Sequence, residues 1–132
     1  MSWTHSDAAR DAANDGRLAL IGAGSKIELR TGAKSLTASG TLLYDFALAA
    51  GFGASSSGAA ALAGVPLTAL AIATDTIGHC RVTGTDGVTG VLCGDAGLAA
   101  NDFPIAAGSL SVVIGQPLTI SGWTYTTPTE SA

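Results

Sequence analysis

The chain has 132 residues, a length that fits one domain, and 12% of them are charged, against about 25% in an ordinary soluble domain. The net charge is −4 and the mean hydropathy is +0.41. This acidic balance argues against a nucleic-acid partner, which requires a basic patch or an interleaved aromatic platform. A charge-poor, apolar chain favours a surface that neighbouring subunits cover, in an oligomer or a large assembly.

Two long stretches of the chain, residues 46–74 and 103–129, carry no charged side chain. Glycines and prolines interrupt both, so neither supplies the roughly 20 continuous apolar residues of a transmembrane helix. The first residues, MSWTHSDAARDAAND, lack a basic segment followed by an apolar core. We therefore expect no membrane partner and no signal peptide, and synthesis in a cytosol.

Residues 6–16 predict a short helix. Ser6 suits the N-cap, Asp7 suits the positive end of the helix, and Gly16 is expected to end it in a left-handed conformation. The only apolar face is alanine, so the helix is expected to need docking for stability. The segment reads either as an arm anchored by Trp3 or as a frayed terminus.

From residue 25 the pattern changes to that of strands. Residues 25–30 alternate with Ile27 and Leu29 on one face, and residues 41–48 alternate with four large apolar residues pointing inward, namely Leu42, Tyr44, Phe46 and Leu48. The further expected strands are residues 59–63, 66–72, 76–83, 88–93, 110–114 (short and buried) and 118–125. Turn signals recur about every 8–12 residues, which is typical of a sandwich or small barrel. We predict a single-domain, all-β sandwich over residues 17–132, preceded by the short helix or arm at 1–16.

Both cysteines flank a hairpin that is predicted around Asp86-Gly87, a pair that suits a two-residue type I′ turn. Counting outward from this turn places Cys80 directly opposite Cys93, in a pair without backbone hydrogen bonds, where side chains come closest. Val82 shares their face, so this face is predicted to point to the core.

His79 and Arg81 are expected to point the other way from the two cysteines. Two buried free thiols and a cross-strand disulfide both stay open, although cytosolic synthesis opposes the disulfide. A metal site would need two further soft ligands, and the histidines are only His5 and His79.

Signatures of catalysis are missing from the sequence. The segment Gly22-Ala-Gly-Ser-Lys26 lacks the spacing of a phosphate-binding loop, and no nucleophile elbow is present. Four aspartates are expected in turns, where such residues usually bond the backbone: Asp75, Asp86, Asp95 and Asp102. Trp123 and Tyr125 share a face of the last expected strand and suit core or interface packing. We expect no enzyme, no catalytic residue, no cofactor and no metal.

The order of several segments resembles a group of small structural proteins of tailed bacteriophages. The resemblance rests on "KIELRTGA", "GTLLYDFALAAGFGASSSGAAALAG", "TDTIGHCRVTGTDGVTGVLCGDAG" and "IAAGSLSVVIGQPLTISGWTYTTP", and it covers residues 22–128. It rests on order and composition, without a catalytic signature. The positions of Cys80 and Cys93 are plain apolar positions in that group, which favours free thiols.

This resemblance implies a jelly-roll-like sandwich that decorates the outer capsid surface as a cement or head-stabilising protein. The implied partners are the major capsid protein and further copies of the chain, as a homo-dimer or homo-trimer. The implied location is the virion, after synthesis in the bacterial host cytoplasm. The residues expected at the capsid or subunit interface are Trp3, His5, Asp7, Arg10, Trp123 and Tyr125. The alternative is a module of the tail, neck or baseplate that contacts a host receptor.

Overall fold

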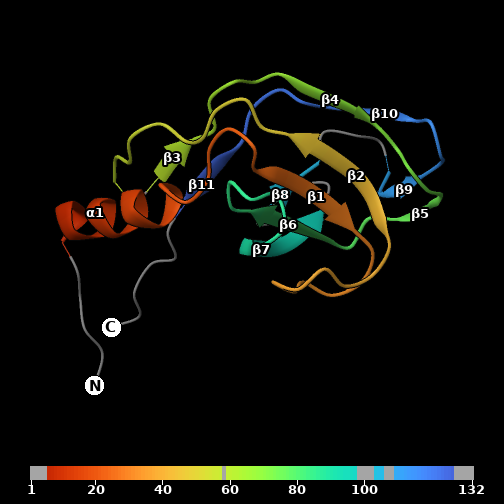
Figure 1. Ribbon diagram of the computed structural model, residues 1–132, viewed down its shortest axis with the longest axis horizontal. Helices are drawn as coiled ribbons and strands as arrows, with labels where there is room; N and C mark the ends of the chain where they lie inside the picture. The colour runs from red at the N-terminus through yellow and green to blue at the C-terminus, as the bar shows by residue number, and fades with distance from the viewer. Residues whose placement is uncertain (1–5, 58, 98–102, 106–108, 127–132) are drawn as a thin grey trace.

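The computed structural model describes residues 6–57, 59–97, 103–105 and 109–126, and Figure 1 shows their arrangement. The domain is all-β with one short N-terminal helix, as the sequence predicts. The elements are α1 (Asp7–Leu18), β1 (Lys26–Arg30), β2 (Leu42–Ala47), β3 (Ala59–Ala61), β4 (Leu67–Leu70), β5 (Asp75–Thr76), β6 (His79–Thr83), β7 (Gly90–Gly97), β8 (Phe103–Pro104), β9 (Ser111–Val112), β10 (Pro117–Ile120) and β11 (Thr124–Thr126).

One larger sheet and three two-stranded ribbons hold these strands. The five-stranded sheet has the order β2-β1-β6-β7-β8, and its last pair is parallel while the others are antiparallel. The ribbons pair β4 with β10, β3 with β11 and β5 with β9. Helix α1, β3 and β11 lie at one end of the molecule, and β5 and β9 lie at the other (Figure 1).

The core lies on one face of the five-stranded sheet. The register places two residues from each of β1, β2 and β6 side by side on this face. All six side chains are at most 2% exposed: Ile27, Leu29, Tyr44, Phe46, Cys80 and Val82. The inner side chains of the β4–β10 ribbon, Leu118 and Ile120, complete the same cluster. The Tyr44 hydroxyl donates a hydrogen bond to the Gln116 carbonyl at 2.9 Å, which joins the sheet to the ribbon. Burial also raises the pKa of this phenol.

Helix α1 begins as predicted and ends later. Ser6 is its N-cap and accepts a hydrogen bond from the Ala9 amide at 3.2 Å. The prediction that Gly16 ends the helix is wrong, because the helix continues to Leu18, which is buried in the core. A glycine inside a helix costs about 1 kcal/mol relative to alanine, and burial of a leucine contributes more than that. Tertiary packing therefore sets this boundary.

Two predicted strands near the C-terminus differ from the structure. The single strand expected over residues 118–125 is two strands, β10 and β11, which pair in separate ribbons on either side of Gly122. Glycine in a strand interior weakens it and allows a bend, so each half reaches its own partner. The buried strand expected over residues 110–114 is only the two-residue β9, and the adjoining Val113 and Ile114 are more than half exposed.

Candidate functional site

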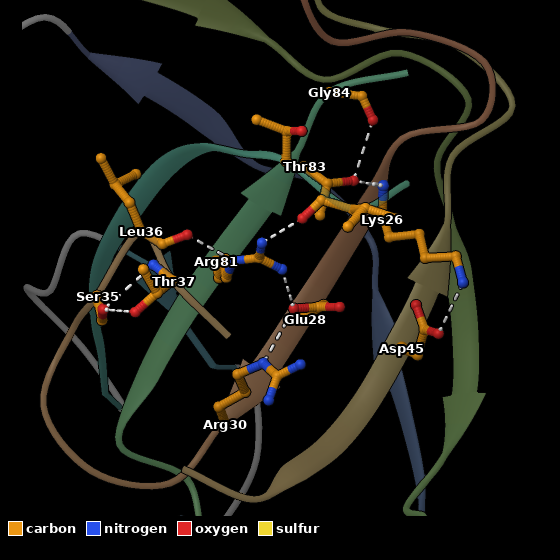
Figure 2. Close-up of polar contacts among 12 residues, drawn as sticks. Lys26, Glu28, Arg30, Ser35, Leu36, Thr37, Asp45, Arg81, Thr83 and Gly84 are labelled. Carbon is orange, nitrogen blue, oxygen red and sulfur yellow. Dashed lines mark hydrogen bonds and ion pairs between the residues drawn. The ribbon is translucent and has the colours of Figure 1, made fainter. Parts of the chain in front are cut away.

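The face of the five-stranded sheet that points away from the core carries a balanced set of charges. We call it the charged face, and the register of the four antiparallel strands places three cations and three carboxylates on it: Lys26, Arg30, Arg81, Glu28, Asp45 and Asp95. Figure 2 shows most of this set around β1 and β6. The pattern KIELR in β1 produces it directly, because alternate side chains of a strand point to opposite faces.

Glu28 and Arg81 form the buried centre of the charged face. The Arg81 Nη1 atom donates to Glu28 Oε1 at 2.7 Å, and Arg30 Nε donates to the same oxygen at 2.9 Å (Figure 2). Both Glu28 and Arg81 are at most 6% exposed. Burial alone would raise the pKa of the Glu28 carboxyl, but hydrogen bonds and charges from the two arginines outweigh it and hold that pKa below its ordinary value.

The segment between β1 and β2, residues 31–41, folds over the charged face, and we call it the strap. Arg81 Nε donates to the Leu36 carbonyl at 2.8 Å, and Arg81 Nη2 donates to the Val88 carbonyl at the tip of the next hairpin. One guanidinium therefore joins β1, the strap and the β6–β7 hairpin. Thr31 and Thr41 close the base of the strap with two mutual hydrogen bonds. The Thr31 amide donates to the Thr41 carbonyl, and the Thr41 amide donates to the Thr31 hydroxyl.

Two glycines allow the strap to lie directly on β6 and β7. A Cβ atom at Gly78 would overlap the backbone of Gly32, and one at Gly90 would overlap the carbonyl of Leu36. His79 lies beneath the strap and is fully buried, with its Nδ1 atom 3.2 Å from the Gly32 carbonyl oxygen. The predictions that His79 and Arg81 face away from the core are confirmed, and the strap explains why both are nonetheless buried.

The predicted pairing of the two cysteines is wrong. Thr83 pairs with Gly90 as the count from the turn requires, but a bulge beyond this pair shifts the register by one residue. Cys93 therefore lies opposite Arg81, and Cys80 lies opposite Gly94. A shift of one residue moves a side chain to the other face, so the two thiols are on different faces and both are free.

The turn of this hairpin is also wider than the predicted two-residue type I′ turn. Gly87 has a positive φ of 73°, but Asp86 does not, whereas a type I′ turn requires both. Of the four aspartates that were expected in turns, Asp86 is in a turn, and Asp75 and Asp95 are within β5 and β7. Asp102 lies outside the described residues.

The Cys80 thiol stays protonated in the core. Its burial is the main cause that raises its pKa, and the nearby Cys93 and Glu28 raise this pKa further.

Asp86 organises the hairpin tip through its carboxylate. Its Oδ1 atom accepts from the amides of Val88 and Thr89 at 2.9 Å, and its Oδ2 atom accepts from the Thr89 hydroxyl at 2.6 Å. These bonds, that of the Thr89 hydroxyl above all, lower the pKa of Asp86 to about 2.

Replacing Asp86 with alanine is expected to destabilise the fold at neutral pH, and the loss is expected to shrink in acid. The folded pKa of about 2 lies below the ordinary value of 3.8, so the carboxylate stabilises the fold fully above pH 3.8 and loses this effect as the pH falls through 2. Thermal unfolding of both proteins across that pH range measures the difference. Thr85→Ala, at the same exposed tip, is the control. Its unfolding temperature should differ from that of the original protein by an amount that does not depend on pH.

The described interface candidates gather at the end of the molecule that carries α1, which we call the helix end. Asp7 and Arg10 lie on α1 and pair with each other at 3.2 Å, while Trp123 and Tyr125 lie just before and within β11 (Figure 1). Trp3 and His5 lie outside the described residues.

A continuous set of contacts fixes α1 to β11. The buried Asn14 donates to the Ser55 hydroxyl at 2.7 Å, and the Ser55 amide donates to Asp15 at 2.8 Å. The same loop holds Phe52, whose ring packs edge-on against Trp123 with the centroids 5.3 Å apart. The predicted alternative of a frayed helix is therefore wrong for residues 7–18, because the helix is docked.

Two of the three ribbons, β3–β11 and β4–β10, carry no charged side chain in their described residues. The described residues of 46–74 and 109–126 include no Asp, Glu, Lys, Arg or His, and they supply β3, β4, β10 and β11. Strand pairing thus brings together the two uncharged stretches of the sequence, which are far apart along the chain. The charges of the five-stranded sheet thus lie on the charged face, while these two ribbons carry none.

Sequence reasoning missed the Glu28–Arg81 pair, the strap and the exposed apolar residues next to β9. The signal for the pair was available: KIELR and HCRVT both place their charged residues on the face that does not enter the core, three in KIELR and one in HCRVT. No signal in one sequence shows that a loop will cover that face.

Within the residues that the structure describes, no group of three or more His, Cys, Asp or Glu side chains is placed to hold a metal ion. No helix in this part of the chain is long and apolar enough to cross a membrane. Comparisons with known proteins find no match, whether with family models, curated proteins or solved structures.

Proposed function

We propose that this protein is a non-enzymatic component of a bacteriophage virion, which binds the outer capsid surface and stabilises the head as a decoration protein. The observation that carries the proposal is the helix end, where the loop that docks α1 through Ser55 also holds Phe52 against the half-buried Trp123. Trp and Tyr are enriched in the buried centres of protein interfaces, and Trp123 and Tyr125 are both half-buried here. The sequence resemblance supplies the major capsid protein as the partner.

The proposed mechanism is passive. A domain that binds across the boundary between capsid subunits adds buried area, so internal pressure has to break more contacts to open the shell. A stable contact of this kind buries about 1,600 Å² in total. Repetition around the shell and association between copies add avidity. The buried charges do not conflict with this role, because Glu28, Arg30 and Arg81 satisfy one another within the fold.

Copy number in purified virions tests the proposed function. Quantitative mass spectrometry against the major capsid protein should give roughly one copy per capsid subunit, or per few subunits, as repeated decoration requires. A handful of copies per particle would contradict decoration and support the tail, neck or baseplate alternative. Absence from particles would contradict both.

Replacing Ala12 with arginine tests the helix end as the capsid contact. Ala12 is exposed on α1, so the longer side chain should leave the unfolding temperature unchanged while it blocks a close contact. We expect co-sedimentation with capsids to fall by tenfold or more, about 1.4 kcal/mol of binding free energy. Val88→Arg, at the exposed hairpin tip, is the control and should bind like the original protein. Equal binding by both variants would remove the helix end from the interface.

A further inference from the structure

A second exposed surface lies away from the helix end. Four large apolar residues at the end of β4 and just after β4 and β9 are more than half exposed: Leu70 (60%), Ile72 (52%), Val113 (59%) and Ile114 (63%). We call them the apolar strip. Side chains exposed to this extent give on the order of 400 Å² of apolar area, within the range of about 300–600 Å² in which the largest patch of a monomer is often functional.

Backbone hydrogen bonds hold the apolar strip together as one surface. The Ala71 amide donates to the Gln116 carbonyl at 2.9 Å, and the Gly115 amide donates to the Ala71 carbonyl at 2.8 Å. These bonds bring the chain around Leu70 and Ile72 against the turn that carries Val113 and Ile114. The Ile114 amide also donates to the Thr74 hydroxyl at 2.9 Å. The strip is therefore preformed, and binding a partner needs little ordering of the backbone.

The outer face of the β4–β10 ribbon continues the strip with uncharged residues. Register pairs Leu70 with Pro117 and Thr68 with Thr119, and the last two hydroxyls hydrogen-bond each other at 2.9 Å. The charged residue nearest to the strip along the chain is Asp75, on β5. Within the described part of the chain, the ribbon β4–β10 and the turn at residues 113–116 therefore give the apolar residues an uncharged polar border.

The charge distribution selects the kind of partner that fits this surface. An interface with a different protein usually gains specificity and association rate from complementary charges, and the strip has none to offer. Two copies of a chain with a net charge of −4 repel each other overall, although the charged face itself is balanced. An uncharged surface is where two copies can meet without like charges in contact and without desolvating a charge.

We propose that the apolar strip is a self-association surface, on which a second copy of this chain docks through the same residues about a two-fold axis. Such an isologous contact places each strip against its own equivalent. It buries four apolar side chains that are each more than half exposed in the single chain, and it leaves the helix end of both copies free. The proposal identifies the surface behind the expected homo-oligomer, and it does not depend on capsid binding, because it concerns the isolated chain.

Sedimentation equilibrium of the purified protein tests the self-association surface. The chain of 12.9 kDa is expected to sediment at twice this mass at concentrations on the order of 100 µM and to dissociate on dilution. Ile72→Lys and Ile72→Glu should each weaken the dimer by tenfold or more, because each places two like charges in the contact. An equimolar mixture of the two variants should recover a dimer, since unlike charges then meet.

Val88→Lys is the matched control, because Val88 is 70% exposed at the hairpin tip and lies outside the strip. It should dimerise like the original protein. Circular dichroism and the unfolding temperature should be unchanged in all three variants, since the substituted side chains are exposed. A strictly monomeric original protein would overturn the proposal and assign the strip to a partner of different sequence. A dimer that Ile72→Lys leaves intact would overturn it as well.

Discussion

Replacing Arg81 with leucine is expected to lower the free energy of unfolding by about 3 kcal/mol or more, which is the usual cost of removing one partner of a buried ion pair. Arg81 is 5% exposed and donates to Glu28, to the Leu36 carbonyl and to the Val88 carbonyl. Its removal leaves two carbonyl oxygens without this donor and Glu28 with one cation in place of two. Urea unfolding at neutral pH measures the loss.

Lys34→Leu is the matched control for Arg81→Leu. Lys34 is exposed in the same strap, so this change removes the same charge without breaking a buried contact, and it should shift stability by less than about 0.5 kcal/mol. Equal losses in the two variants would show that overall charge, and not the buried pair, is responsible.

Acid provides a second readout for the Glu28–Arg81 pair. The pKa of Glu28 is lowered below its ordinary value of 4.5, so its ionised form stabilises the fold above that pH and this contribution is lost as the pH falls. The difference in the free energy of unfolding between the original protein and Arg81→Leu should therefore become smaller in acid. A difference that stays constant would contradict the role of Glu28 as the partner.

Replacing Gly90 with alanine is the second change with a large expected effect, a loss of about 2–3 kcal/mol, at the upper end of the usual cost of overpacking. The added methyl group would overlap the Leu36 carbonyl, a backbone atom of the strap that cannot rotate away, and would approach Arg81 Nε to 3.1 Å. The strap is then expected to lift from the charged face. Trypsin cleavage after Lys34 should become faster, and mass spectrometry of the fragments detects it.

Gly16→Ala is the control for Gly90→Ala, and its expected effect has the opposite sign. Gly16 lies inside α1 with no atom within 4 Å of an added Cβ, so alanine should stabilise the helix by up to about 1 kcal/mol. Trypsin cleavage in the strap should not change in this variant. Stabilisation by Gly90→Ala would mean that the strap does not lie on β7 in solution.

Local signals were sufficient wherever a residue's role depends on its near neighbours. The alternation in KIELR predicts β1 and its core face, and Ser6 predicts the start of α1. The alternation over residues 41–48 predicts β2 and the buried Tyr44, Phe46 and Leu48, but the inward position expected for Leu42 is wrong. A register shift places Leu42 opposite Arg30 on the charged face, and Leu43 is buried in the core instead.

The position of the hairpin between β6 and β7 and its Thr83–Gly90 pair were also predictable, although the turn type was not. Its register beyond Thr83 was not, because one bulged residue reverses the facing of every residue after it, as it does for Cys93.

The sequence by itself determined an all-β chain with one N-terminal helix, a low charge and two uncharged stretches, since composition and period-two alternation are local properties. Only the tertiary structure decided which segments lie together. It split residues 118–125 between two ribbons, extended α1 to the buried Leu18 and buried Glu28 and Arg81 beneath the strap. These outcomes depend on long-range pairing, where burial and hydrogen bonds outweigh local preference, and no local pattern encodes the partner that a strand or loop will meet.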